Sequence, residues 1–129
     1  HTKAKSIKEM AGQLINNFGG EVPDTMEELL TLSGIGRKTA NLMLGDIFGK
    51  PAIVTDTHCI RITGRLGLTK NKEPAKVEKG LIKLIPPENS SHFCHQIVEF
   101  GRDICSARKP KCGDCPLNYF CKYYNGGNK

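Results

Sequence analysis

Four cysteines near the C-terminus have the spacing of a metal-binding or cluster-binding segment. Cys105, Cys112, Cys115 and Cys121 follow the pattern C-x6-C-x2-C-x5-C. Four thiolates this close in sequence can enclose one metal ion or one iron–sulfur cluster, and disulfides are unfavourable in an intracellular chain. The spacing leaves zinc and iron–sulfur equally open, although a zinc ribbon uses two C-x2-C pairs and this segment has one.

The loop between the first two of these cysteines is basic. It carries Arg108, Lys109 and Lys111, with Pro110 between them. A basic loop held in place by a metal centre is suited to contact phosphates. The alternative is a solvated charged loop. The two remaining cysteines, Cys59 and Cys94, are expected to be buried thiols on helical faces.

The stretch LSGIGRKTAN, residues 32–41, is a candidate phosphate-binding turn. It predicts a tight glycine turn followed by a helix from about residue 37. Glycine permits positive φ and leaves backbone amides uncovered, and a helix N-terminus offers unpaired N–H groups that attract anions. Such contacts carry no base information. The candidate DNA-binding residues here are Gly34, Ile35, Gly36 and Arg37. The alternative is an ordinary helix–loop–helix corner.

Lys38 and Asp56 are the candidate catalytic pair. Lys38 falls in the first helical turn, where the dipole disfavours a cation, and only a neutral amine is a nucleophile. Asp56 lies in VTDTHCIR, where an N-cap is the alternative role. A helix from Lys38 to Phe48 rises about 15 Å. An extended return from Pro51 to Asp56 covers about 16–17 Å, so the two side chains are expected to meet. We interpret His58 as a supporting or surface residue.

Apolar residues with helical periodicity predict an all-α fold. Expected helices cover residues 7–18, from about 26, 37–48, 56–66, 73–85 and about 90–102. Gly19 is expected to end the first, and Ser90 or Ser91 to cap the last. The faces expected to be buried include Ile7, Met10, Leu14, Ile15 and Phe18, then Leu29 and Leu30, and later Val77, Leu81 and Leu84. The predicted organisation is a helical region at 1–102, a cysteine-rich segment at 103–123 and a tail at 124–129. Residues 51–55 are expected to be extended but too isolated to form a sheet.

Composition points to a polyanionic partner. The chain has 129 residues, a formal charge of +6 and a pI of about 9.1, which favours nucleic acid. No apolar run approaches the length of a bilayer span, and no signal peptide is visible. We therefore expect a soluble, cytoplasmic protein without membrane contact, associated with the nucleoid if it is bacterial.

Taken together, the motifs resemble one family, endonuclease III of the helix-hairpin-helix DNA glycosylase superfamily. LSGIGRKTAN resembles its hairpin, VTDTH its catalytic aspartate segment, and the four-cysteine spacing its [4Fe–4S] loop. The order and separations agree from about His1 to Cys121. The resemblance implies a partial helix-hairpin-helix glycosylase fold, with the hairpin at about 26–48 and the cluster loop at 103–123.

The resemblance also implies a function in base-excision repair. It implies a DNA N-glycosylase and DNA-(apurinic or apyrimidinic site) lyase that removes oxidised pyrimidines from duplex DNA and cuts by β-elimination. Lys38 would be the Schiff-base nucleophile and Asp56 the essential carboxylate. The four cysteines would hold a [4Fe–4S] cluster, with zinc less favoured. Arg108, Lys109 and Lys111 would contact DNA.

One part of the family pattern has no counterpart in the sequence. The family has a helical segment before the matched region, so we expect a C-terminal portion of a longer, monomeric parent enzyme. Apolar faces are then expected to be exposed or to self-associate, and the portion to be weak or inactive alone. Two alternatives remain, an adenine-mismatch monofunctional glycosylase and a non-catalytic DNA-binding fragment.

Overall fold

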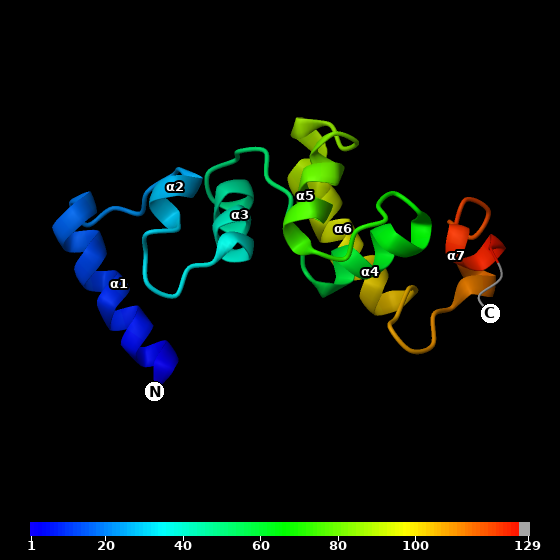
Figure 1. Ribbon diagram of the computed structural model, residues 1–129, viewed down its shortest axis with the longest axis horizontal. Coiled ribbons are helices and arrows are strands. Elements are labelled where there is room, and N and C mark those ends of the chain that lie inside the picture. The colour runs from blue at the N-terminus through cyan, green and yellow to red at the C-terminus, as the bar shows by residue number, and fades with distance from the viewer. Residues whose placement is uncertain (127–129) are drawn as a thin grey trace. The chain divides into compact units, whose positions relative to one another are not determined.

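The computed structural model describes residues 1–126, which form helices and no strand, confirming the all-α prediction. The chain divides into two compact units, His1–Lys50 and a second that begins at Pro51. The first contains α1 (Thr2–Phe18), α2 (Met26–Leu29) and α3 (Arg37–Asp46) (Figure 1). The predicted organisation at 1–102, 103–123 and 124–129 follows motifs rather than packing and stays a prediction.

Helix α1 has the predicted C-terminal stop but an exposed apolar face. Gly19 ends the helix in the left-handed conformation, with φ of 63°. Met10, Leu14 and Phe18 from the predicted core face are half-buried. Ile7 and Ile15 from the same face are 62% and 69% exposed. The first unit thus presents apolar side chains to solvent.

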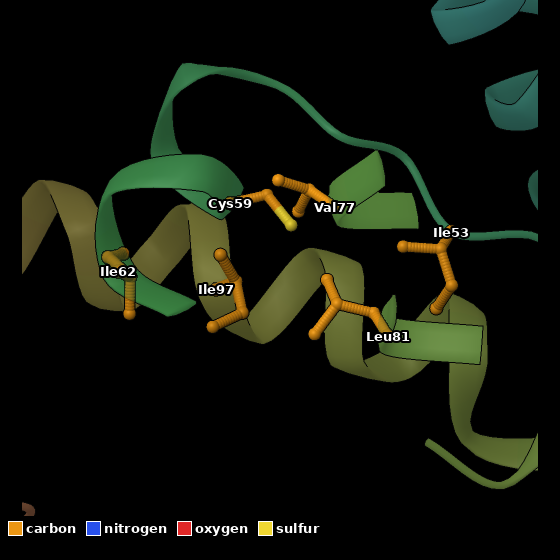
Figure 2. Packing of buried hydrophobic residues seen from close by; sticks show 6 residues of the cluster. All are labelled: Ile53, Cys59, Ile62, Val77, Leu81 and Ile97. Atoms are coloured by element: carbon orange, nitrogen blue, oxygen red, sulfur yellow. The ribbon is translucent and has the colours of Figure 1, made fainter. Parts of the chain in front are cut away.

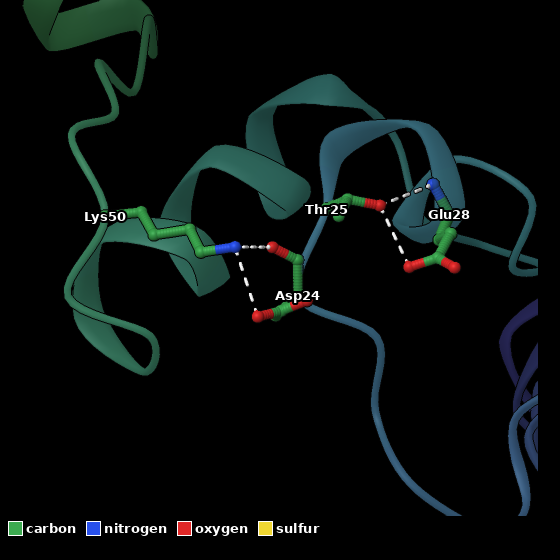
Figure 3. Close-up of polar contacts among 4 residues, drawn as sticks. All are labelled: Asp24, Thr25, Glu28 and Lys50. Atoms are coloured by element: carbon green, nitrogen blue, oxygen red, sulfur yellow. Dashed lines mark hydrogen bonds and ion pairs between the residues drawn. The ribbon is translucent and has the colours of Figure 1, made fainter.

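Helix α2 begins with Thr25 as a side-chain N-cap. The hydroxyl of Thr25 accepts a hydrogen bond from the backbone N–H of Glu28 at 3.3 Å and donates one to its carboxylate at 2.9 Å (Figure 3). Leu29 is fully buried, as predicted. Leu30 was predicted to be buried but is exposed, because α2 ends at Leu29.

The ends of the hairpin segment are joined by an ion pair. Lys50 Nζ lies 3.1 Å from Asp24 Oδ2 and also donates a hydrogen bond to the Asp24 carbonyl (Figure 3). Both side chains are partly exposed. Exposed ion pairs add little to stability, about 0–1 kcal/mol. This contact therefore matters mainly because it connects the segment that enters the hairpin with the segment that leaves it.

The second unit contains the longer helices and the cysteine segment. Its elements are α4 (Thr57–Leu66), α5 (Pro74–Ile82), the 3-10 turn η1 (Pro87–Asn89), α6 (Ser90–Asp103), the 3-10 turn η2 (Cys112–Asp114) and α7 (Lys122–Asn125). Helix α4 packs against both α6 and α7. The buried core is drawn in Figure 2 and consists of Ile53, Cys59, Ile62, Val77, Leu81 and Ile97.

Helix α4 approaches α6 closely at Gly101. A Cβ on this residue would lie 2.5 Å from His58 Nδ1 and 2.9 Å from Ile62 Cδ1. Any larger side chain at Gly101 would therefore collide with α4. This close approach brings the N-terminal half of α4 against the helix that leads into the cysteine segment.

Three boundary predictions for the second unit are corrected by the structure. Helix α5 ends at Ile82, so Leu84 is 54% exposed instead of facing the core. The N-cap of α6 is Asn89, and it makes no side-chain capping bond; a serine cap was predicted. The first two residues of the expected tail at 124–129 belong to α7. Residues 127–129 of that tail lie outside the described residues.

No helix within residues 1–126 combines the length and apolar character that crossing a membrane requires.

Candidate functional site

The two glycines of the hairpin turn have different conformations. Gly34 has φ of 80°, a left-handed value that an L side chain rarely adopts. Gly36 has φ of −98° and ψ of 178°, which is ordinary extended backbone. It precedes α3 as an N-cap without a side-chain capping bond. Ile35 between them is half-buried, and its N–H donates to the Leu32 carbonyl at 3.2 Å. The first turn of α3 therefore has no side-chain cap covering its amides.

Polar side chains of α1 hold this turn, a support that the sequence analysis missed. The amide of Gln13 donates to the Thr31 carbonyl at 3.2 Å and accepts from the Ser33 N–H at 2.7 Å. The Ser33 hydroxyl donates to the Glu9 carboxylate at 2.9 Å. These partners are about twenty residues apart, and no local pattern indicates them. Their effect is to fix the backbone that leads into the glycine turn.

Lys38 lies in the first turn of α3 with an exposed side chain. Within residues 1–50 its amine makes no hydrogen bond or ion pair, so it is available to a ligand of this unit. Arg37 beside it is also exposed. The structure thus places the predicted nucleophile and phosphate contacts at one uncapped helix end.

Asp56 is the N-cap of α4 in the second unit. Its Oδ1 accepts a hydrogen bond from the Cys59 N–H at 2.7 Å, and the side chain is half-buried. The capping role considered from the sequence is therefore real. It leaves Oδ2 without a hydrogen-bond partner in the described part of this unit. Lys38 and Asp56 belong to different units, and their expected meeting stays a prediction.

The thiols of Cys59 and Cys94 lie near Asp56. Cys59 is fully buried, and burial, followed by the nearby Cys94 and Asp56, raises its pKa to about 12. Cys94 is half-buried, and its Sγ accepts from the Val54 N–H at 3.3 Å. Cys59 is thus a packed, protonated thiol, as predicted, whereas Cys94 is only partly covered.

The four clustered cysteines all line one pocket. Its wall combines these thiols with apolar and aromatic side chains, among them Leu66, Phe100, Ile104, Tyr123 and Tyr124. Burial, followed by the neighbouring Cys105, Cys121 and Cys115, raises the pKa of Cys112. Among residues 1–126, no three His, Cys, Asp or Glu side chains converge as ligands of a single ion. The four thiols line one common pocket, as the ligands of a multi-iron group would.

Two arginines of α4 hold the start of the cysteine segment, and the sequence analysis missed both. Arg61 donates to the Cys105 carbonyl from Nε at 3.2 Å and Nη2 at 2.9 Å, and Arg65 Nη1 donates to the Ser106 carbonyl at 2.7 Å. His58 Nδ1 lies 3.1 Å from Arg61 Nη2. Its supporting role stays a prediction. The only sequence signal was the i, i+4 spacing of the two arginines, which places them on one helix face.

The basic residues of the predicted loop are exposed around a fixed backbone. Arg108, Lys109 and Lys111 all reach solvent, while Pro110 is half-buried and lines the cysteine cavity. The Lys111 N–H donates to the Ile104 carbonyl at 2.9 Å, which closes the loop at its base. The structure therefore anchors this loop beside the cavity and leaves its charges accessible to an anion.

Comparison with known proteins identifies both motifs. The helix-hairpin-helix motif matches residues 17–42, and the iron–sulfur binding domain of endonuclease III matches residues 105–121. Endonuclease III from Synechocystis sp. is 49% identical over 92% of this chain and 55% of its own length.

Solved structures agree. An endonuclease III trapped as a covalent intermediate with DNA, in an estranged-adenine complex, matches with a TM-score of 0.91 and 40% identity over 99% of this chain. A non-covalent endonuclease III–DNA complex matches with a TM-score of 0.90 and 41% identity over 97% of this chain. The chain spans 61% and 59% of those two proteins.

These matches decide the cofactor that the spacing left open. The iron–sulfur domain and the endonuclease III relatives indicate a [4Fe–4S] cluster rather than zinc. The residues present fit it, because the cavity offers four thiols, an apolar wall and the guanidinium of Arg65. In sequence and in fold, this chain is similar to endonuclease III over most of its own length, and the match includes the hairpin and the iron–sulfur binding domain.

Proposed function

We propose that the protein containing this chain is a base-excision repair enzyme that binds duplex DNA. Its activity is that of a DNA N-glycosylase and abasic-site lyase acting on oxidised pyrimidines. The observation that carries the proposal is the match, at a TM-score of 0.91, to an endonuclease III joined covalently to DNA. A covalent DNA adduct requires a nucleophile, and Lys38 is an exposed amine at the hairpin helix end.

The hairpin would bind the DNA backbone. The uncapped amides at the start of α3 follow Gly34 and Gly36, and Gln13 and Ser33 fix the turn beneath them. A phosphate at a helix N-terminus gains hydrogen bonds and a favourable dipole interaction. This phosphate contact would place the adjacent Lys38 amine close to the sugar. Ile35 and Arg37 complete the proposed contact at this turn.

The chemistry would run through Lys38 and Asp56. The neutral amine attacks C1′ of a nucleotide extruded from the duplex, the glycosidic bond breaks, and the base leaves with its electron pair and takes up a proton. Ring opening gives a Schiff base between Lys38 and C1′. Loss of a C2′ proton then expels the 3′ phosphate by β-elimination. The Asp56 carboxylate would accept the amine proton and stabilise positive charge on the sugar.

The cysteine cavity would shape a second DNA contact. We propose that its four thiols ligate the cluster, which supplies a rigid, redox-capable core to the segment when bound. The ligands are Cys105, Cys112, Cys115 and Cys121. Arg108, Lys109 and Lys111 are exposed on the anchored loop and would neutralise phosphates. Such contacts should make binding depend strongly on salt.

Borohydride trapping on the full-length protein tests the proposal. Duplex DNA with an abasic or oxidised pyrimidine site should give a covalent adduct, because borohydride reduces the Schiff base to a stable amine. Lys38→Arg should abolish the adduct while keeping the charge and most DNA affinity, since a guanidinium forms no such imine. Lys8→Arg on α1 is a matched control that should trap normally.

The outcomes separate the alternatives. An adduct that survives Lys38→Arg would overturn the role given to Lys38. Base removal without any adduct would favour a monofunctional glycosylase of the adenine-mismatch type. DNA binding with neither product would favour a non-catalytic DNA-binding protein.

A further inference from the structure

Arg65 makes a set of contacts with the cysteine segment that backbone support alone does not explain. Its Nη1 donates to Cys105 Sγ at 3.3 Å as well as to the Ser106 carbonyl at 2.7 Å. Its Nη2 donates to the Ala107 carbonyl at 2.9 Å. The guanidinium carbon lies 4.7 Å from the centre of the Tyr123 ring. One side chain thus binds a thiol, two carbonyls and an aromatic face.

Arg65 is also joined to the far end of the segment. Cys121 Sγ lies 3.5 Å from the Arg65 carbonyl, and Arg65 itself lines the cysteine cavity. The same helical residue therefore touches the first and the last cysteine of the four. Because α4 begins at the cap residue Asp56, this one helix connects the candidate catalytic carboxylate to the cysteine cavity.

Arg61 provides an internal comparison one turn earlier. It binds the Cys105 carbonyl and, at 3.3 Å, the Gly101 carbonyl. It does not line the cysteine cavity, and none of its contacts within residues 51–126 involves a thiol. Arg61 therefore supports the same backbone as Arg65 without an interaction with sulfur.

A charged donor on a cluster thiolate has two physical effects. Charge-assisted hydrogen bonds are stronger than neutral ones and orient the ligand. One-electron reduction adds negative charge to a [4Fe–4S] cluster, and a nearby positive donor stabilises that charge, so it raises the reduction potential. Both effects are largest for a donor at the sulfur. A donor at the carbonyl makes no hydrogen bond to sulfur, and its Coulomb interaction with the cluster is weaker because it decreases with distance.

We propose that Arg65 is a positioning residue for the cluster, holding the Cys105 thiolate, raising the cluster's reduction potential and slowing loss of iron. The inference rests on the four-thiol ligand set proposed above. It assigns α4 a role in cluster chemistry in addition to its presentation of Asp56.

Two matched substitutions test this in the cluster-loaded protein. Arg65→Met keeps the length of the side chain and removes the donors and the charge. It should lower the potential, measured by dithionite titration against redox dyes, and speed iron release to a chelator by about 10- to 100-fold. Arg61→Met should reduce thermal stability and change the potential less than Arg65→Met does.

Equal reduction potentials in the unsubstituted protein and in Arg65→Met would overturn the proposal. Equal shifts of the potential in Arg65→Met and Arg61→Met would also overturn it. If Arg65→Met does not load, Arg65→Lys decides by the same measurements. It keeps the charge but lacks the planar fork, so its iron release should be faster than in the parent. Parent-like iron release and potential would again overturn the proposal. An unaltered protein without visible iron–sulfur absorbance would instead refute the ligand set.

Discussion

Asp56 has two separable roles, and two substitutions distinguish them. Its Oδ1 caps α4 through the Cys59 N–H at 2.7 Å, while the proposed chemistry needs a carboxylate. Asp56→Asn keeps a good capping acceptor but removes the charge. Asp56→Ala removes both. The two variants should therefore agree in activity and differ in stability.

The magnitudes follow from the capping geometry. Loss of a negative charge at the helix N-terminus costs about 0.3–1 kcal/mol. Loss of the cap in Asp56→Ala costs about 0.5–2 kcal/mol. Loss of proton transfer by a positioned side chain slows turnover by about 10²–10⁴-fold. Asp56→Asn should thus be nearly as stable as the parent, and both variants should be almost inactive.

Denaturant unfolding and single-turnover cleavage of DNA with one oxidised pyrimidine measure these effects in the full-length protein. DNA affinity under matched salt serves as the control and should change little in Asp56→Asn. Near-normal turnover in Asp56→Asn, combined with lost turnover and stability in Asp56→Ala, would refute the catalytic role. In that case Asp56 would be a structural cap alone.

Three further predictions concern stability and local opening of the fold. Gly101→Ala places a Cβ 2.5 Å from His58 Nδ1 and should destabilise the fold by about 1–3 kcal/mol in denaturant unfolding. Gln13→Leu leaves the Ser33 N–H and Thr31 carbonyl without their partner, so hydrogen exchange in the hairpin turn should accelerate while exchange in α6 stays unchanged. The pKa of Cys59 is raised to about 12, so the folded state keeps a proton that the unfolded chain loses above its ordinary pKa of 9.0. The contribution of this thiol to the free energy of unfolding should therefore be constant below pH 9.0 and fall between pH 9.0 and about 12. Cys59→Ala should remove that part of the fall.

Local patterns predicted most of the helices. Apolar periodicity located α1 and α5, and the glycine turn located α3. Gly19 ends α1 because glycine readily adopts the left-handed conformation found there. The same reasoning placed Leu84 in the core, because it continued the periodicity past Ile82. Periodicity describes the face of a helix but carries no information on where backbone hydrogen bonding ends.

The sequence suggested the reactive groups of the candidate site but not the residues that support them. Lys38, Asp56 and the four cysteines were proposed because their types and spacing suit a reaction or a ligand, and their roles stay predictions. Gln13 and Arg65 were missed because each acts on a backbone group about twenty or more residues away. The pairing of Lys38 with Asp56 stays a prediction. The rise of a helix and the length of an extended segment determine how far the chain travels, but they do not determine its direction.

The contact between Asp24 and Lys50 has a consequence for synthesis of the chain. The hydrogen bonds described for the hairpin join residues numbered 50 or below, from Glu9–Ser33 to Asp24–Lys50. The cysteine segment, in contrast, is held by α4 and is translated after the hairpin. Domains fold as they emerge, N-terminal parts first. We therefore expect the hairpin to be assembled on the ribosome before Cys121 is translated, so that iron is required only after the hairpin has formed.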